Sequence, residues 1–212
     1  MTEFENVLPE EIEKRSFEII SEELSQMGIV LDEEEKPIIM RAIHTAADFD
    51  YAKNMVFSDG AIKKAIKALE EGSTIVTDTQ MAKAGINKAA CKKLGVNVEC
   101  FIADEDVKEA AIKNGTTRSN ASMEKACNIE GNVIFAIGNA PTALIKLYDL
   151  IEEGRINPSL IIGVPVGFVN VVQSKELIMK ADVPYIVARG RKGGSNVAAA
   201  IVNALLYKIT RK

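Results

Sequence analysis

Five short apolar runs, each followed by a stretch with helical character, restrict the possible folds of this chain more than any other feature. The runs are rich in β-branched residues and span residues 74–77, 96–102, 132–137, 160–164 and 185–188. Continuous apolar strands that alternate with helices are typical of a parallel sheet with both faces covered. The pattern therefore predicts an α/β fold: a single three-layer domain with a mostly parallel sheet of about five strands and helices on both faces.

The helices are expected at residues 61–70, 88–94, 107–113, 119–128, 142–153, 175–181 and 195–208. About 50 residues at the N-terminus also have a helical pattern. Pro9 begins a first segment that stops at Gly28, and a second runs from Glu33 to about Asp48. No long linker or internal repeat divides the chain, so residues 1–212 are expected to form one domain.

Composition excludes several classes of function. The 212 residues carry a net charge of −4, which gives no reason to expect nucleic acid as a partner. No apolar run approaches the roughly 18 residues of a membrane span, and the acidic N-terminus lacks a signal-peptide core. We therefore expect a soluble, cytoplasmic protein with no membrane partner. The three cysteines form no CxxC pair and His44 is the only histidine, so neither disulfides nor a metal site are expected.

Small, polar and glycine residues follow the predicted strands, where ligands bind in parallel α/β sheets. Asn139 is expected to cap the helix that follows the third strand. The last loop, residues 189–195, has three glycines and three cations at a helix start, which favours an anion site; a turn with solvated basic residues is the alternative. The glycine fingerprint of dinucleotide folds belongs in the first strand–helix turn, so that fold is disfavoured.

Two further side chains are candidates for chemistry. His44 lies among Ile43, Ala46 and Ala47, so we expect it to face inward, with Asp48 as a partner one turn on; a buried core histidine is the alternative. A neighbouring carboxylate favours the imidazolium, which suits a proton donor near neutral pH. Arg118 begins a predicted helix, where a cation is unfavourable, so we expect it to contact a ligand or a carboxylate partner; a surface arginine is the alternative.

Taken together, the motifs resemble one family, the precorrin-8X (cobalt-precorrin-8) methylmutases of cobalamin biosynthesis. The resemblance extends from about residue 10 to 207, and small departures at Thr45–Ala47 and Asn87-Lys88 fall between motifs. The matching segments are Arg15-Ser16-Phe17, Ile43-His44 with Asp48, Val56-Phe57-Ser58, Ala68-Leu69 with Gly72, Asp78…Met81…Ala84-Gly85-Ile86, Thr117-Arg118-Ser119, Gly138-Asn139-Ala140-Pro141-Thr142-Ala143-Leu144, Pro165-Val166-Gly167-Phe168-Val169, Ser174-Lys175 and Gly190-Arg191-Lys192-Gly193-Gly194-Ser195.

The resemblance implies an isomerase that moves a methyl group from C-11 to C-12 of ring C, giving hydrogenobyrinate or its cobalt form, cobyrinate. The migrating group stays on the substrate, so S-adenosylmethionine or any other cofactor is not expected, and any cobalt is carried by the substrate. The resemblance makes His44 the catalytic residue, which protonates or hydrogen-bonds the ring C nitrogen. It also implies a homodimer with the site near the interface.

The tetrapyrrole substrate carries many carboxylates, for which arginines and helix N-termini are suitable partners, and its macrocycle needs apolar walls. Phe168 and Met81 are the candidates for those walls, with core packing as the alternative. The substrate-binding residues expected from the resemblance are Arg15, Ser16, Asp78, Met81, Arg118, Gly138, Asn139, Phe168, Arg191, Gly193, Gly194 and Ser195.

Two other functions remain open at this stage. The first is a corrin-binding carrier without chemistry, which would tolerate the loss of His44 because it needs no proton donor. The second is an α/β nucleotide-binding enzyme that uses residues 190–195 as a phosphate loop.

Overall fold

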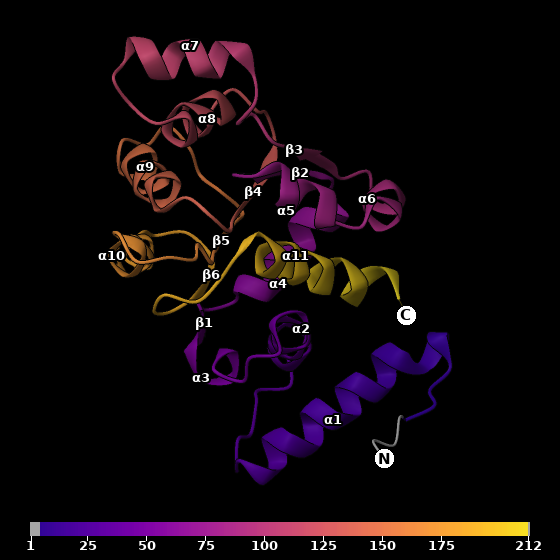
Figure 1. The fold of residues 1–212 in the computed structure, drawn as a ribbon. Helices are drawn as coiled ribbons and strands as arrows, with labels where there is room; N and C mark the ends of the chain where they lie inside the picture. Colours follow the sequence, from indigo (N-terminus) through magenta and orange to yellow (C-terminus); the bar gives the residue numbers. More distant parts are fainter. Residues whose placement is uncertain (1–4, 212) are drawn as a thin grey trace.

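Six strands form one sheet in the computed structural model, which describes residues 5–211 (Figure 1). The strand order is β1-β6-β5-β4-β2-β3, and every neighbouring pair is parallel except β1 and β6. The strands are β1 Met55–Phe57, β2 Ser73–Thr77, β3 Asn97–Glu99, β4 Asn132–Ile137, β5 Leu160–Gly163 and β6 Tyr185–Ala188.

The parallel sheet and its five predicted strands are confirmed, but the total is six rather than about five. The additional strand, β1, has three residues and pairs antiparallel with β6 at the sheet edge. So short a run carries no periodic signal, and it is stabilised by pairing rather than by its own pattern. β3 is also shorter than the predicted 96–102, since only Asn97–Glu99 pair with β2.

The helices are the 3₁₀ helix η1 Pro9–Glu11, and α1 Ile12–Gln26, α2 Lys36–Ala46, α3 Tyr51–Asn54, α4 Ala61–Glu70, α5 Gln80–Gly85, α6 Lys88–Leu94, α7 Glu105–Lys113, α8 Arg118–Ala126, α9 Pro141–Glu152, α10 Val171–Ile178 and α11 Ser195–Thr210. Most helices fall near their predicted positions, whereas the short helices α3 and α5 were not predicted. The residues after β2 were expected to form a loop, but Gln80–Gly85 form the helix α5. Thr79 caps α5 by accepting a hydrogen bond from the Ala82 N–H at 3.1 Å.

Alternate residues of each strand pack into separate cores on the two faces of the sheet. In β4, Ile134 and Ala136 pack with α2, α4, α6 and α11, whereas Phe135 and Ile137 pack with α8, α9 and α10. Figure 1 shows these two groups of helices on opposite sides of the strands. The predicted three-layer architecture is therefore confirmed.

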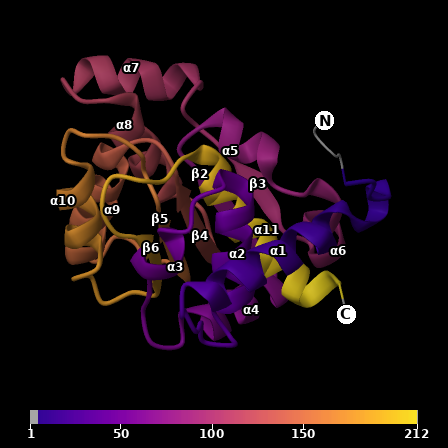
Figure 2. The same ribbon diagram turned by 60° about the horizontal axis from the view of Figure 1, so that its bottom comes forward.

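The N-terminal helices extend one of these layers outward. α2 packs on α11, and α1 packs on α2, so that α1 lies outside α2 on the side away from the sheet (Figure 1). Figure 2, turned so that this side comes forward, shows α1 and α2 in front of α11. The guanidinium of Arg41 on α2 lies over the rings of Phe17 (5.1 Å) and Tyr207 (4.9 Å) and bonds Glu13 at 2.7 Å, which fixes α1 to the other two helices.

Candidate active site

The loops after β2, β4, β5 and β6 meet at one edge of the sheet, because these strands are parallel neighbours. Gly138 directly follows β4, Gly163 ends β5 and Gly190 lies two residues after β6, so all three glycines are at carboxyl strand ends as predicted. Asp78 directly follows β2 and joins two of these loops. Its carboxylate accepts hydrogen bonds from the backbone N–H groups of Gly138 (3.0 Å), Asn139 (2.8 Å) and Ala140 (2.6 Å).

Asp78 acts inside the protein and not as an open ligand-binding group. It is 1% exposed, and both of its oxygens are already bonded to the loop before α9. Burial raises the pKa of Asp78, and the three N–H bonds oppose that rise because they favour the carboxylate. The structure therefore makes Asp78 a positioning residue, where the sequence predicted a substrate contact.

Asn139 does not cap α9, contrary to the sequence prediction. The N-cap residue of α9 is Ala140, which offers no side-chain cap, and the Asp78 carboxylate supplies the acceptor from another strand. The Asn139 residue is exposed at the sheet edge, so its amide is free to face a ligand.

Three positions of the site require glycine, two because of close backbone packing and one because of its backbone conformation. A Cβ on Gly138 would lie 2.7 Å from the carbonyl oxygen of Gly194, and one on Gly193 only 2.0 Å from that of Val164. Gly194 itself has a φ of 140°, which side chains rarely permit. The loops before α9 and α11 are therefore in direct contact, and the positive ends of two helix dipoles converge on one place.

Ser195 connects the start of α11 to the loop after β2. Its hydroxyl lies 2.7 Å from that of Thr79, and it is the first residue of α11. The Ser195 residue is only half-buried, so the hydroxyl lies at the border between the packed loops and the surface.

The three cations of the last loop have different partners. The Arg189 guanidinium bonds Glu176 of α10 at 3.3 Å. The Lys192 ammonium bonds Asp48 at 2.7 Å and Asp50 at 2.6 Å, both just beyond the end of α2. These two cations are therefore neutralised within the protein and are poor candidates for substrate carboxylates.

Arg191 is the cation of this loop that remains available. It is exposed, and among residues 5–211 no carboxylate lies within ion-pair distance of it. Its guanidinium lies 5.4 Å from the ring centroid of Phe168, which is 81% exposed. An unpaired guanidinium over an exposed ring suits a ligand that has both carboxylates and a flat apolar surface.

A buried lysine on α10 stabilises the loop between β6 and α11. The Lys175 ammonium donates to the carbonyl oxygens of Gly190 (2.9 Å) and Lys192 (2.8 Å), and the residue is 0% exposed. Burial lowers the pKa of Lys175 to about 8. The sequence singled out Ser174-Lys175 only as part of the resemblance, since nothing in the local pattern of α10 signals a buried cation.

His44 lies at the end of α2, and two expectations about it are wrong. It is exposed and does not face the core. Its predicted partner Asp48 bonds Lys192 instead, because the chain turns away from the helix at Ala47. The His44 Nδ1 lies 2.7 Å from the hydroxyl oxygen of Ser16 on α1, and the ring packs edge-on against Phe17 with centroids 5.4 Å apart.

His44 and Ser16 line a pocket of about 500 Å³ between α1 and the end of α2. Most of the other lining side chains are apolar, so the exposed imidazole lies between a polar partner and an apolar surface. Arg15 also lines the pocket, but its guanidinium bonds Glu5 at 2.6 Å and lies 3.6 Å from Glu18. The pocket residues are Glu5, Val7, Ile12, Arg15, Ser16, Ile19, Ile20, Glu23, Ile43, His44, Ala47 and Phe49.

Arg118 is the first residue of α8 and is exposed. Within the described residues it has no carboxylate partner at ion-pair distance, although it lies at a helix end that disfavours cations. The Thr117 and Thr142 hydroxyls, 3.3 Å apart, place the starts of α8 and α9 side by side. Arg118 is therefore a second available guanidinium near the Asp78-bound loop.

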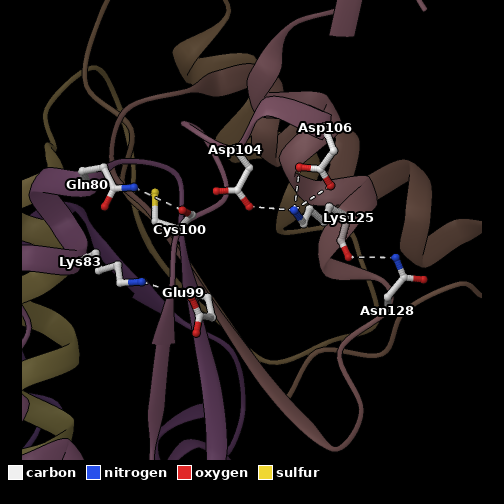
Figure 3. A network of polar contacts seen from close by, with 8 residues as sticks. All are labelled: Gln80, Lys83, Glu99, Cys100, Asp104, Asp106, Lys125 and Asn128. Carbon is white, nitrogen blue, oxygen red and sulfur yellow. Dashed lines mark hydrogen bonds and ion pairs between the residues drawn. The ribbon is translucent and has the colours of Figure 1, made fainter. Parts of the chain in front are cut away.

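Met81, on α5, is 70% exposed, so neither Met81 nor Phe168 belongs to the core. Polar contacts hold α5 against the end of β3, as Figure 3 shows: Lys83 bonds Glu99 at 3.1 Å and the Gln80 amide donates to the Cys100 carbonyl at 3.3 Å. These contacts fix the helix and leave Met81 outside.

The neighbouring cation Lys125 is not a ligand candidate. Asp104 and Asp106 both bond its ammonium at 2.7 Å, which connects α8 to the start of α7 (Figure 3). The available cations of this region are thus Arg118 and Arg191.

The fold and the site define a class: an α/β protein with two available guanidiniums at the carboxyl edge of a parallel sheet, and an imidazole in a mostly apolar pocket between α1 and the end of α2. Comparisons with known proteins give the family. A model of the precorrin-8X methylmutase family matches residues 11–208. The cobalt-precorrin-8 methylmutase of Priestia megaterium is 46% identical over 206 residues, covering 96% of this chain and 91% of that protein.

Two further proteins agree. The cobalt-precorrin-8 methylmutase of Leptospira interrogans is 44% identical over 209 residues, covering 95% of this chain and 94% of the relative. The crystal structure of the precorrin-8X methyl mutase from Thermus thermophilus has a TM-score of 0.85 and 35% identity, over 95% of this chain and 98% of that one. The chain belongs to the precorrin-8X methylmutase family and is an isomerase, which confirms the resemblance noted in the sequence.

Family membership does not favour the two other functions. The phosphate-loop alternative also has a structural difficulty, because Lys175 and Lys192 of that region are bonded within the protein. Within residues 5–211, no three His, Cys, Asp or Glu side chains gather as a metal site would require. None of the helices in the described part of the chain has the length and apolar character needed to cross a bilayer.

Proposed function

We propose that this protein is a cobalt-precorrin-8 methylmutase, which moves a methyl group from C-11 to C-12 of ring C and yields cobyrinate. The observation that carries the proposal is the single histidine of the chain, exposed in an apolar pocket with Ser16 on its Nδ1. The names of the two relatives described above support the cobalt-bearing form of the substrate.

The proposed chemistry needs one proton donor. Migration of a methyl group around the conjugated ring is easier when electron density can flow to a protonated imine-type nitrogen. Ser16 lies on Nδ1 of His44, so Nε2 is the nitrogen left to face ring C. It would protonate the free ring C nitrogen of metal-free precorrin-8X; in the cobalt form, where cobalt binds that nitrogen and draws electron density itself, it would donate a hydrogen bond at the edge of ring C. The C-11–methyl bond breaks as the C-12–methyl bond forms, and any proton on nitrogen is released afterwards. General acid assistance of this kind contributes roughly 10²–10⁴-fold.

The rest of the proposed site holds the macrocycle. Arg118 and Arg191 would bind substrate carboxylates, together with the backbone N–H groups near Gly138 and Gly194. Phe168 would contact the ring face, with Met81, Asn139 and Ser195 at its border, and Arg15 would contribute after exchange of its Glu5 partner. No S-adenosylmethionine is required, since the methyl group never leaves the substrate, and the cobalt belongs to the substrate.

The proposal includes a homodimer in the cytoplasm that binds neither nucleic acid nor membranes. The net charge of −4 supports the absence of a nucleic-acid partner. Sedimentation equilibrium of the purified protein tests the dimer, and a monomer at micromolar concentration would contradict it.

The test of the function is to incubate the purified protein with cobalt-precorrin-8 and, separately, with metal-free precorrin-8X, and to follow the visible spectrum. Methyl migration changes the conjugated system, so conversion is visible in the spectrum. We expect conversion of both substrates, and faster conversion of the cobalt form, as the names of the relatives suggest. Binding without a spectral change would make the protein a carrier. Faster conversion of precorrin-8X would contradict the choice of the cobalt substrate.

A further inference from the structure

The chain that leads from α2 through α3 to β1 is joined to β6 and to the loop that follows β6. The pairing begins in the sheet, where Met55 is opposite Ala188 at the end of β6. It continues beyond the strand, since the Arg189 N–H donates to the Asn54 carbonyl at 2.8 Å. The segment that leads back to His44 is therefore attached at Asn54 and Met55 to the segment that leads to the anion loop.

The Lys192 side chain makes a further contact between these two segments. Its ammonium lies 2.7 Å from Asp48 and 2.6 Å from Asp50, and the Asp48 carboxylate also accepts the Asp50 N–H at 3.0 Å. The hydrogen bond from the Lys192 ammonium lowers the pKa of Asp48, which favours the carboxylate form of Asp48 while the loop is in place. Lys192 thus connects the anion loop to the turn that ends the His44 helix.

That turn has a conformation that depends on such contacts. Ala47 ends α2 with φ 49° and ψ 39°, a left-handed conformation that a residue with a Cβ adopts at a cost. His44 lies one helical turn before it. Phe49 packs against the core, and its two neighbours in the chain, Asp48 and Asp50, form ion pairs with Lys192. The direction of the last turn of α2 is fixed by these two contacts.

We propose that Lys192 is a positioning residue for the proposed reaction: it holds the end of α2 against the anion loop, so that the His44 imidazole and the bound macrocycle have a fixed relative placement. The inference depends on the proposed function, because it concerns the rate of the His44-dependent step. Without the cation, Asp48 and Asp50 would repel each other beside the turn, and the helix end would shift. Displacement of a catalytic group by about 1 Å can cost about 100-fold in rate.

The cluster is well suited to a decisive test because it contributes little to stability. The Lys192 and Asp50 side chains are 49% and 56% exposed, and exposed ion pairs have small effects on unfolding. Arg189 provides a matched control, since its side chain in the same loop is 55% exposed and bonds a carboxylate on α10 instead. A kinetic effect specific to Lys192 therefore reflects placement and not loss of loop charge.

The first experiment measures kcat and KM for cobalt-precorrin-8. Lys192→Met is expected to lower kcat at least about tenfold with KM changed less than about threefold, since placement and not binding is lost. Lys192→Arg should recover most of the loss, and Arg189→Met should stay within about twofold of the wild-type protein. An unchanged kcat in Lys192→Met contradicts the proposal, and so does a salt-dependent rise in KM alone, which would make Lys192 a substrate ligand.

The second experiment does not depend on turnover. His44 is the only histidine, so its imidazole gives isolated NMR signals in the tag-free protein. Lys192→Met and the milder Asp50→Asn should shift these signals and Arg189→Met should not. Adding Ala47→Gly to Lys192→Met should move the signals back toward wild type, because glycine adopts the left-handed turn freely. Unchanged signals in both variants overturn the inference even if the methylmutase activity is absent, and absent activity in the wild-type protein refutes the proposed function separately.

Discussion

Replacing Lys175 with Met should change how the stability of the protein depends on pH. Lys175 is 0% exposed, and its ammonium has two carbonyl partners but no carboxylate. Burial lowers its pKa from 10.5 to about 8 in the folded protein. Between about pH 8 and about pH 10.5 the unfolded chain therefore binds more protons than the folded one, and the free energy of unfolding rises with pH across this window. At 1.36 kcal/mol per pH unit, the Lys175 contribution is about 3 kcal/mol.

Urea denaturation of both proteins at several pH values across this window measures the effect. The quantity to plot is the free energy of unfolding of the wild-type protein minus that of Lys175→Met. This difference cancels the contributions of other groups that titrate at high pH in both proteins. Among them are Cys91, whose pKa is raised by burial, and Tyr51, whose pKa is raised by burial to about 12. We expect this difference to increase by about 3 kcal/mol from the lower to the upper limit. A difference that stays constant with pH would refute the account of Lys175 as a desolvated ammonium beneath the loop.

Three further predictions concern the loops. Asp78→Ala leaves three backbone N–H groups without their acceptor and should lower the free energy of unfolding by about 3 kcal/mol or more in urea denaturation; a loss below about 1 kcal/mol would contradict the positioning role. Gly193→Ala places a Cβ 2.0 Å from the Val164 carbonyl oxygen, so the loop must move and corrin affinity measured by spectral titration should fall; unchanged affinity would contradict it. Arg191→Ala should weaken corrin binding more at low than at high salt, with Arg189→Ala as the control, and equal effects of the two variants would argue against a specific contact.

Most of the fold could be predicted because the central parallel strands β4, β5 and β6 are largely buried on both faces. Such strands are mostly apolar, and this makes them visible in the sequence. β4 and β6 have the bounds that the apolar runs predict. β1 was missed because its three residues pair on one side only, and α5 was missed because its six residues follow polar residues typical of a loop. Short elements depend on their neighbours more than on their own pattern.

The site was predictable in its residue types but not in its contacts. Helical spacing placed Asp48 within reach of His44, yet the left-handed Ala47 turns the chain away and Lys192 takes the carboxylate. Local sequence also cannot show that Ser16, 28 positions earlier, supplies the partner of His44. Contacts of this kind depend on how α1 packs on α2, which is decided by tertiary structure and not by periodicity.

The central claim is that His44 donates a proton to the substrate, and single-turnover visible spectroscopy of His44→Ala tests this claim most directly. The variant should keep the melting temperature of the wild-type protein, because His44 is exposed, and should still bind metal-free precorrin-8X, whose ring C nitrogen can accept the proton, and the rearranged product. Its rearrangement should be at least about 100-fold slower, with a smaller loss in Ser16→Ala, where the imidazole remains but is no longer oriented. A folded His44→Ala protein that binds the substrate and rearranges it at the wild-type rate would contradict the account.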